Sequence, residues 1–433
     1  MSLAALTERL HAFEPSTRTG RVTRIAAGHV EADGPDGPIG AACVIEAGGS
    51  SCLATIVSVD ADRVVLAPLD PLDGVRRGAR VRLDALAVRP LTGDAFCGRV
   101  VDGLGRALDA GSAPSGEPSV GGTLPTLERV TSPAPLLTGV RAIDGLLPLA
   151  TGQRVGVFAA PGVGKTTLVS QLASQVEADR CVICLVGERG REVEALWSKG
   201  LPESAKARTT VVAATSDQTA ALRVQAVEQA LALAGAWRAR GLHVLFVLDS
   251  ATRYAMALRE LGLAAGEPPT IRAYTPSVFA ALPKLVERCG AARNGGAISA
   301  VLTVLSETDD VDDPIVEVMK SLLDGHIVLS RRIAETGRFP AVDVSRSISR
   351  LAGGVMSATH RALAAEAQAS IGAYDAARTL IEAGVYTAGA DAAIDAAIRR
   401  RPALEAFLRQ DDGAASPAAT LAALAAALKG DAP

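Results

Sequence analysis

The residues best suited to chemistry lie in one stretch, residues 159–167, which reads AAPGVGKTT. Gly162 and Gly164 permit the unusual backbone dihedrals that turn N–H groups inward around an anion. Lys165 can reach the β- and γ-phosphates of a nucleotide, and the hydroxyl of Thr166 can ligate Mg²⁺. The stretch nearly fits the pattern G-x-x-x-x-G-K-[ST] and predicts a site for the phosphates of ATP with Mg²⁺.

The context of this loop agrees with that interpretation. The run VGVFA before it predicts a buried strand, and TTLVSQLASQVEA after it predicts a helix whose N-terminus faces the anion. An alanine, Ala159, stands at the first glycine position, where the strand ends and a Cβ need not touch phosphate. Proline stiffens the loop and removes one donor. The residues assigned to the nucleotide are Pro161, Gly162, Val163, Gly164, Lys165, Thr166 and Thr167.

Two acidic residues follow other apolar runs. Asp249 ends HVLFVLD, and an aspartate there can hold the Mg²⁺ shell opposite Thr166. Glu188 follows CVICLVG, and a carboxylate at the C-terminal end of a parallel strand lies at the ligand crevice. Glu188 could polarise the water that attacks the γ-phosphate. The alternative for Glu188 is a solvated turn, GERGRE.

Three regions with different sequence patterns must position these residues. Residues 1–92 carry short β-rich runs separated by turn signals, which predict a small antiparallel barrel. Residues 93–356 alternate buried strand runs (VGVFA, CVICLVG, TTVVAAT, HVLFVLD, AISAVLTVL) with helical patterns, which predict an α/β fold with a parallel sheet. Residues 357–433 are alanine-rich and helical in pattern.

Composition excludes several other classes of protein. No apolar run approaches the roughly 18 residues of a membrane span, and MSLAALTERLHAF lacks the features of a signal peptide. The six cysteines are scattered, which favours reduced thiols in the cytoplasm. Cys181 and Cys184 form a C-x-x-C, but on a strand they point to opposite faces, so we expect buried residues. The five histidines lie far apart, and the net charge of −3 does not indicate nucleic-acid binding.

The first residues of the chain show a helical pattern. Leu3, Leu6, Leu10 and Phe13 fall on one face of a helix. Such a face either packs on its own barrel or docks a partner protein.

The longer phrases of the sequence resemble the type III secretion ATPases, the flagellar export and injectisome enzymes related to the catalytic subunits of rotary ATP synthases. The resemblance rests on TGVRAIDGLLPLATGQRVGVFA, APGVGKTTL, GERGREVEAL, VLDSATRYAMALRE, GEPP, PSVFAALPKLVERCG, DGHIVLSRRIA, FPAVDVSRSISR and LIEAGVYTAGADAAIDAAI. These segments run in family order from about residue 98 to 410, and the barrel matches more loosely through GRVTRI and PIGAACVIE.

The resemblance implies a RecA-like P-loop core and a role for each matching residue. Lys165 and Thr166 would hold phosphate and Mg²⁺, with Asp249 as the second Mg²⁺-side acid. The family accepts Ala or Gly at Ala159, while Ala160-Pro161 departs from its commoner small-residue pair. The remaining implied roles are the catalytic carboxylate for Glu188, a γ-phosphate sensor for Arg189, a pocket-lining residue for Arg253, an aromatic on the adenine ring for Phe339, and the arginine finger of a neighbouring site for Arg350.

The resemblance also implies an assembly. It predicts a homohexameric ring with a coiled-coil stalk protein in its pore and a stator-like regulator on the N-terminal helix. The enzyme would lie in the cytoplasm, peripherally associated with the inner-membrane export gate, and would unload export substrates from chaperones. Both flagellar and injectisome use fit the sequence.

Three other functions stay open at this point. A catalytic subunit of a rotary ATP synthase is disfavoured because the C-terminal run IDAAIRRRPALEAFLRQ lacks the acidic, lever-like segment of those chains. A non-catalytic nucleotide-binding subunit is disfavoured by Glu188. A ring helicase on RNA would need a basic or aromatic face, and only 3% of the residues are aromatic.

Overall fold

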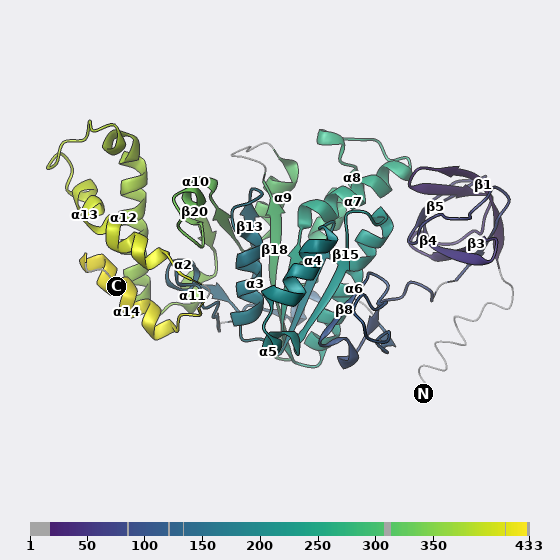
Figure 1. Cartoon of the computed structure of the whole chain (residues 1–433), viewed down its shortest axis with the longest axis horizontal. Helices are drawn as coiled ribbons and strands as arrows, with labels where there is room; N and C mark the ends of the chain where they lie inside the picture. The colour runs from purple at the N-terminus through teal and green to yellow at the C-terminus, as the bar shows by residue number, and fades with distance from the viewer. Residues whose placement is uncertain are drawn as a thin grey trace. The chain divides into compact units, whose positions relative to one another are not determined.

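A computed structural model describes residues 18–84, 86–119, 122–132, 134–306, 313–411 and 413–430 (Figure 1). The expected N-terminal docking helix lies outside these residues. The chain divides into two compact units. One comprises the described part of Met1–Arg89 with Asp217–Gln225 and Met256–Val278, and the other comprises the described parts of Pro90–Ser216, Ala226–Ala255 and Phe279–Pro433.

The first unit contains a closed antiparallel barrel. Alternating residues of its strands, such as Val30, Ile45 and Leu66, are fully buried and fill the interior. The strands close in the order β1-β2-β5-β4-β3-β6. They are β1 (Thr19–Ala26), β2 (His29–Ala32), β3 (Ala42–Ala47), β4 (Ser50–Val59), β5 (Val64–Pro68) and β6 (Arg80–Leu83).

The second unit is built on one large sheet in the order β20-β19-β13-β18-β16-β14-β15-β8, with β17 pairing β18 and β10 pairing β17. The strands from β19 to β8 run parallel, and β20 is antiparallel to β19. They are β8 (Arg99–Val101), β10 (Arg129–Val130), β13 (Arg154–Ala159), β14 (Arg180–Val186), β15 (Thr209–Ala214), β16 (His243–Asp249), β17 (Gly290–Ala292), β18 (Ala297–Leu305), β19 (Gly325–Leu329) and β20 (Val342–Ser349).

Helices alternate with these strands. They are α2 (Arg141–Leu146), α3 (Lys165–Gln175), α4 (Gly190–Ala195), α5 (Glu203–Lys206), α6 (Ala220–Ala239), α7 (Ala251–Ala264), α8 (Pro276–Glu287), α9 (Pro314–Leu322), α10 (Arg331–Glu335) and α11 (Ala352–Val355). Short pieces complete the chain: η1 (Asp94–Phe96), η2 (Thr126–Glu128), η3 (Leu196–Gly200), η4 (Ile271–Ala273), and the paired strands β7 (Leu91–Thr92) with β9 (Glu117–Pro118) and β11 (Pro135–Leu136) with β12 (Leu149–Ala150).

Three further helices follow: α12 (Ala358–Glu382), α13 (Ala392–Leu408) and α14 (Pro417–Lys429). Each begins at a side-chain cap, from Ser357, Asp391 and Ser416 respectively, which satisfies free N–H groups of the first turn. Their small alanine side chains let the helices pack closely, and Phe407 and Leu424 are buried in the core that they share with α2.

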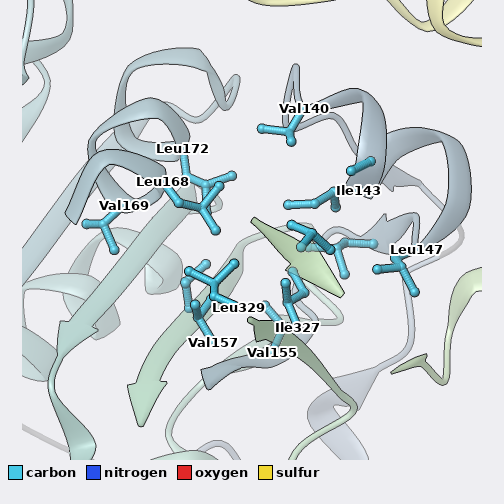
Figure 2. Close-up of a cluster of buried hydrophobic side chains, with 14 of the residues drawn as sticks. Val140, Ile143, Leu147, Val155, Val157, Leu168, Val169, Leu172, Ile327 and Leu329 are labelled. Carbon is cyan, nitrogen blue, oxygen red and sulfur yellow. The ribbon is translucent and has the colours of Figure 1, made fainter. Parts of the chain in front are cut away.

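The core around β13 determines where the phosphate loop lies. Val155 and Val157 of β13 and Leu329 of β19 are buried beneath Leu168 and Leu172 of α3 (Figure 2). These leucines are four residues apart and therefore lie on one face of the helix. Packing this face on the sheet holds the start of α3 at the C-terminal end of β13.

The predicted fold class is confirmed: an antiparallel barrel, a parallel-sheet core and C-terminal helices are all present. Each of the five predicted core strands is found, as β13, β14, β15, β16 and β18. The domain boundaries near residues 92 and 356 stay predictions. Cys181 and Cys184 are fully buried on β14, and burial raises the pKa of the Cys181 thiol to about 11. In the part of the chain that is described, no helix combines the length and apolar character needed to cross a membrane.

Candidate functional site: a nucleotide site at the strand ends

The phosphate loop joins the last residue of β13, Ala159, to the first residue of α3, Lys165. Gly162 and Gly164 have φ angles of 82° and 90°, in the left-handed region that favours glycine. In the described part of the chain, no N-cap side chain accepts a hydrogen bond from the first-turn N–H groups of α3. An anion bound at this helix N-terminus would satisfy them.

Lys165 lies among the two predicted acids. Its ammonium contacts the carboxylate of Asp249 and lies 3.5 Å from Oε1 of Glu188. Asp249 ends β16 and Glu188 follows β14; these are neighbouring parallel strands, so their ends meet at one edge of the sheet. Both acidic residues are buried. The structure thus brings together three residues that are up to 84 positions apart in the sequence.

Two further side chains complete this cluster. Nε of Arg253, in the first turn of α7, lies 3.3 Å from Oε1 of Glu188. The hydroxyl of Thr303, on β18, donates a hydrogen bond of 2.7 Å to Oδ1 of Asp249. Sequence reasoning missed Thr303; the available signal was one of two hydroxyls, with that of Ser299, in the apolar strand AISAVLTVL.

The environment of Glu188 favours its protonated form. Burial raises the pKa of this carboxyl above its ordinary value of 4.5, and a hydrogen bond with Glu192 raises it further. The charges of Lys165 and Arg253 act in the opposite direction but do not reverse the shift. A carboxyl with a raised pKa is a better proton acceptor near neutral pH than an ordinary glutamate.

The other loop residues differ in exposure. Pro161, Thr166 and Thr167 are exposed, while Val163 is buried. The donor set suits Mg²⁺, since a hydroxyl and a carboxylate oxygen are hard ligands and the ion usually takes its other ligands from phosphate and water. The described residues contain no cluster of three or more His, Cys, Asp or Glu that could hold a metal ion by themselves.

Phe339 lies against the phosphate loop. A Cβ placed on Gly164 would stand 3.4 Å from Cδ1 of the Phe339 ring. The side chain nonetheless remains 45% exposed. It therefore presents an aromatic surface next to the loop, which suits stacking on a nucleotide base.

Two predicted residues lie apart from the cluster. Arg189 is exposed, and its only ion pair among the described residues is with Glu192 at 3.8 Å. Arg350 is also exposed and directly follows β20. Ser349 pairs with Gly325 at the start of β19, whereas Leu329 at its end pairs with Ala159 beside the phosphate loop. Arg350 is thus at the opposite end of the sheet from Lys165.

A phosphate loop on a parallel sheet, with two acids at adjacent strand ends, defines a P-loop nucleotide-binding protein. Residues 139–349 match the nucleotide-binding domain of the ATP synthase alpha/beta family, and residues 356–426 match the T3SS EscN ATPase C-terminal domain. The chain belongs to the flagellar and type III secretion ATPases within this family.

The relatives match along nearly their whole length. The chain is 40% identical to a flagellum-specific ATP synthase of Bacillus subtilis, with 95% of each chain covered. It is 41% identical to a type 3 secretion system ATPase of Pseudomonas syringae pv. tomato, with 93% and 92% covered. The structure of the assembled ATPase EscN from enteropathogenic E. coli superposes with a TM-score of 0.88 at 39% identity, over 94% of this chain and 100% of that chain.

Proposed function

We propose that this chain is a Mg²⁺-dependent ATPase that works as a homohexameric ring and energises type III protein export. The observation that carries the proposal is the cluster of Lys165, Glu188 and Asp249 at the phosphate loop. The relatives named flagellum-specific ATP synthase and type 3 secretion system ATPase support the export role. The match of residues 356–426 to the EscN-type C-terminal domain favours export over a rotary synthase subunit.

The residues of one subunit divide the work of phosphoryl transfer. The loop N–H groups and Lys165 bind the β- and γ-phosphates, and the ring of Phe339 holds the base. Thr166 and Asp249 would hold Mg²⁺, which neutralises charge on the phosphate oxygens. Glu188 orients the attacking water and accepts its proton, for which a raised pKa is suited. Arg253 holds the Glu188 carboxylate by an ion pair of 3.3 Å, and Arg189 would sense the γ-phosphate.

Arg350 serves the site of the neighbouring subunit. Within its own subunit the length of β13, five residue steps from Arg154 to Ala159, separates it from the phosphate loop by roughly 16 Å. That span exceeds the reach of one side chain, so an exposed arginine at this position suits action in trans. A finger supplied by a neighbour is worth about 10³ to 10⁵ in rate.

One of the proposed partners has support from a solved structure. That structure shows EscN in complex with its central stalk EscO, with a TM-score of 0.84 to this chain, which supports a stalk protein here; we propose that it is a coiled coil. The enzyme would act in the cytoplasm at the inner-membrane export gate and unload export substrates from their chaperones. A stator-like regulator would bind the N-terminal face of Leu3, Leu6, Leu10 and Phe13. Leu6→Asp with Leu10→Asp should abolish copurification of that regulator; unchanged binding would rule the docking role out.

The central test is ATPase specific activity as a function of protein concentration. We expect wild-type activity to rise steeply as rings assemble, and Glu188→Gln and Arg350→Ala each to lose it. A mixture of the two variants should regain part of the activity, because one supplies an intact site and the other an intact finger. Activity independent of concentration that survives Arg350→Ala would mean that each subunit works alone.

A further inference from the structure

The backbone at Arg350 is held by a hydrogen bond to Asp324, the residue that precedes β19. The N–H of Arg350 donates to the carbonyl oxygen of Asp324 at 2.9 Å. Among the described residues, the one hydrogen bond of its guanidinium is long, 3.4 Å, to the carbonyl oxygen of Lys320. The side chain is therefore free to reach outward, while the backbone that carries it is held at Asp324.

Asp324 is in turn clamped by Arg154, the first residue of β13. Nε and Nη2 of Arg154 donate to the two carboxylate oxygens of Asp324 at 2.9 and 3.0 Å. The backbone N–H of Arg154 adds a third bond to Oδ2 at 3.0 Å, and Asp324 N–H donates back to Arg154 O at 2.9 Å. A bidentate pair of this kind fixes orientation as well as position.

The side chain of Gln153 forms hydrogen bonds with two groups next to Arg350: the preceding residue and the carbonyl that accepts from the Arg350 N–H. This side chain is only 1% exposed, and its Oε1 accepts from the N–H of Ala150 at 2.8 Å. Its Nε2 donates to Ser349 Oγ at 3.1 Å and to Asp324 O at 3.2 Å. One buried amide thus joins the residue before Arg350 to the carbonyl that holds Arg350 itself. A buried glutamine with both amide hydrogens committed specifies a single local geometry.

We infer that Gln153 and the Arg154–Asp324 pair are positioning residues for Arg350, holding it in register for the nucleotide site of the next subunit. This inference rests on the proposed action of Arg350 in trans. β13 begins with Arg154, directly after Gln153, and ends at the phosphate loop, so the same strand supports a subunit's own site and its contribution to its neighbour. The effect of removing Gln153 should then appear in the neighbour's site.

The test mixes two variant subunits and adds Gln153→Met to one of them at a time. This substitution removes both hydrogen bonds that Gln153 donates, at similar side-chain volume. The acceptor subunit carries Arg350→Ala and keeps its own site; the donor subunit carries Glu188→Gln and keeps its finger. With Gln153→Met in the donor, we expect the regained activity to fall roughly 10- to 100-fold, the cost of an ångström-scale misplacement. With Gln153→Met in the acceptor, the regained activity should be retained.

The controls separate positioning from folding. Gln229→Met removes another fully buried glutamine, which bonds the backbone of Leu91 in the same unit, and in the donor it should leave the regained activity unchanged. Asp324→Asn, which weakens the clamp without changing volume, should repeat the donor-only loss. Equal losses in donor and acceptor, no loss in the donor, or an equal loss with Gln229→Met would overturn the inference. If the starting mixture regains nothing, Arg350 does not act in trans, and the inference fails with it.

Discussion

The ammonium of Lys165 contacts the carboxylate of Asp249, and its second acidic neighbour, Glu188, lies 3.5 Å away. One partly buried cation therefore balances two buried carboxylates. The same three residues are the ones that must handle phosphate, Mg²⁺ and water in the reaction. A bound phosphate must then compete with these two acids for the lysine. The ion pairs that stabilise the site are therefore made by the same groups that carry out the reaction.

Removing this cation should cost both binding and stability. Lys165→Met leaves Asp249 and Glu188 buried with less compensation, and breaking a buried pair from one side costs about 3 kcal/mol or more. We expect ATP binding to be lost in titration calorimetry and the free energy of unfolding to fall by about 3 kcal/mol in urea denaturation. Adding Asp249→Asn should restore part of the stability and none of the binding.

The exposed lysine of the last helix, Lys429, provides the matched control. Lys429→Met should change the free energy of unfolding by no more than about 0.5 kcal/mol. If Lys165→Met proved equally mild, the ammonium would not be balancing the two acids.

The ring of Phe339 should determine affinity for the nucleotide. Loss of base stacking costs about 1–3 kcal/mol, so Phe339→Ala should raise the KM for ATP roughly 5- to 150-fold and leave kcat nearly unchanged. Phe339→Tyr keeps the stacking face and should behave like the wild type. Steady-state kinetics over a range of ATP concentrations measures both constants. A fall in kcat at constant KM would assign the ring a role in the chemical step instead.

The part of this site that could be predicted from sequence is the part fixed by strand ends. Glu188 and Asp249 each follow an apolar run, and a parallel sheet brings such ends to one edge. Thr303, Gln153 and Asp324 are single polar residues within or beside strands, and no spacing distinguishes them from ordinary surface positions. Their partners become visible only when the register of the sheet is known.

The positions of Arg189 and Arg350 relative to the site likewise became visible only in the structure. The motif GERGRE placed Arg189 next to Glu188 in sequence, yet the short helix α4 directs Arg189 toward Glu192 and solvent. Adjacency in the chain therefore did not bring Arg189 into the ion pairs that Glu188 makes with Lys165 and Arg253, and its role as a γ-phosphate sensor stays a prediction. For Arg350, the phrase SISR predicted a role in a neighbouring site, and the antiparallel return of β20 accounts for its distance from its own loop.

The raised pKa of Glu188 predicts a pH dependence of catalysis. Glu188 must be deprotonated to accept a proton, so kcat/KM should fall as the pH is lowered through a value above 4.5. Glu192 contributes to that rise, both by its hydrogen bond and by its charge. Glu192→Gln should therefore lower the pKa of Glu188 and move the acidic limb of the profile to lower pH.

The neighbouring Glu194, exposed on the same helix, is the control for this shift. Glu194→Gln removes the same charge at a position that does not contribute to the pKa shift of Glu188, and its profile should match the wild type. An acidic limb that stays in place in Glu192→Gln would show that Glu188 is not the group that titrates.

The chemistry of Arg350 should be sensitive to the shape of its side chain as well as its charge. A guanidinium offers a planar fork to the γ-phosphate oxygens, whereas an ammonium is a point charge on a shorter reach. We expect Arg350→Lys to lower kcat by about 10²-fold or more while the KM for ATP changes less than about threefold, because the base and phosphate contacts belong to another subunit.

Arg361 is the matched control: it is exposed and its Nη2 donates to a single carbonyl oxygen, that of Gly353 at 2.8 Å. Arg361→Lys should keep kcat within about twofold of the wild type. A rise in KM without a fall in kcat for Arg350→Lys would make Arg350 a residue that binds the nucleotide before the reaction, and its role would no longer be that of a finger acting in the transition state.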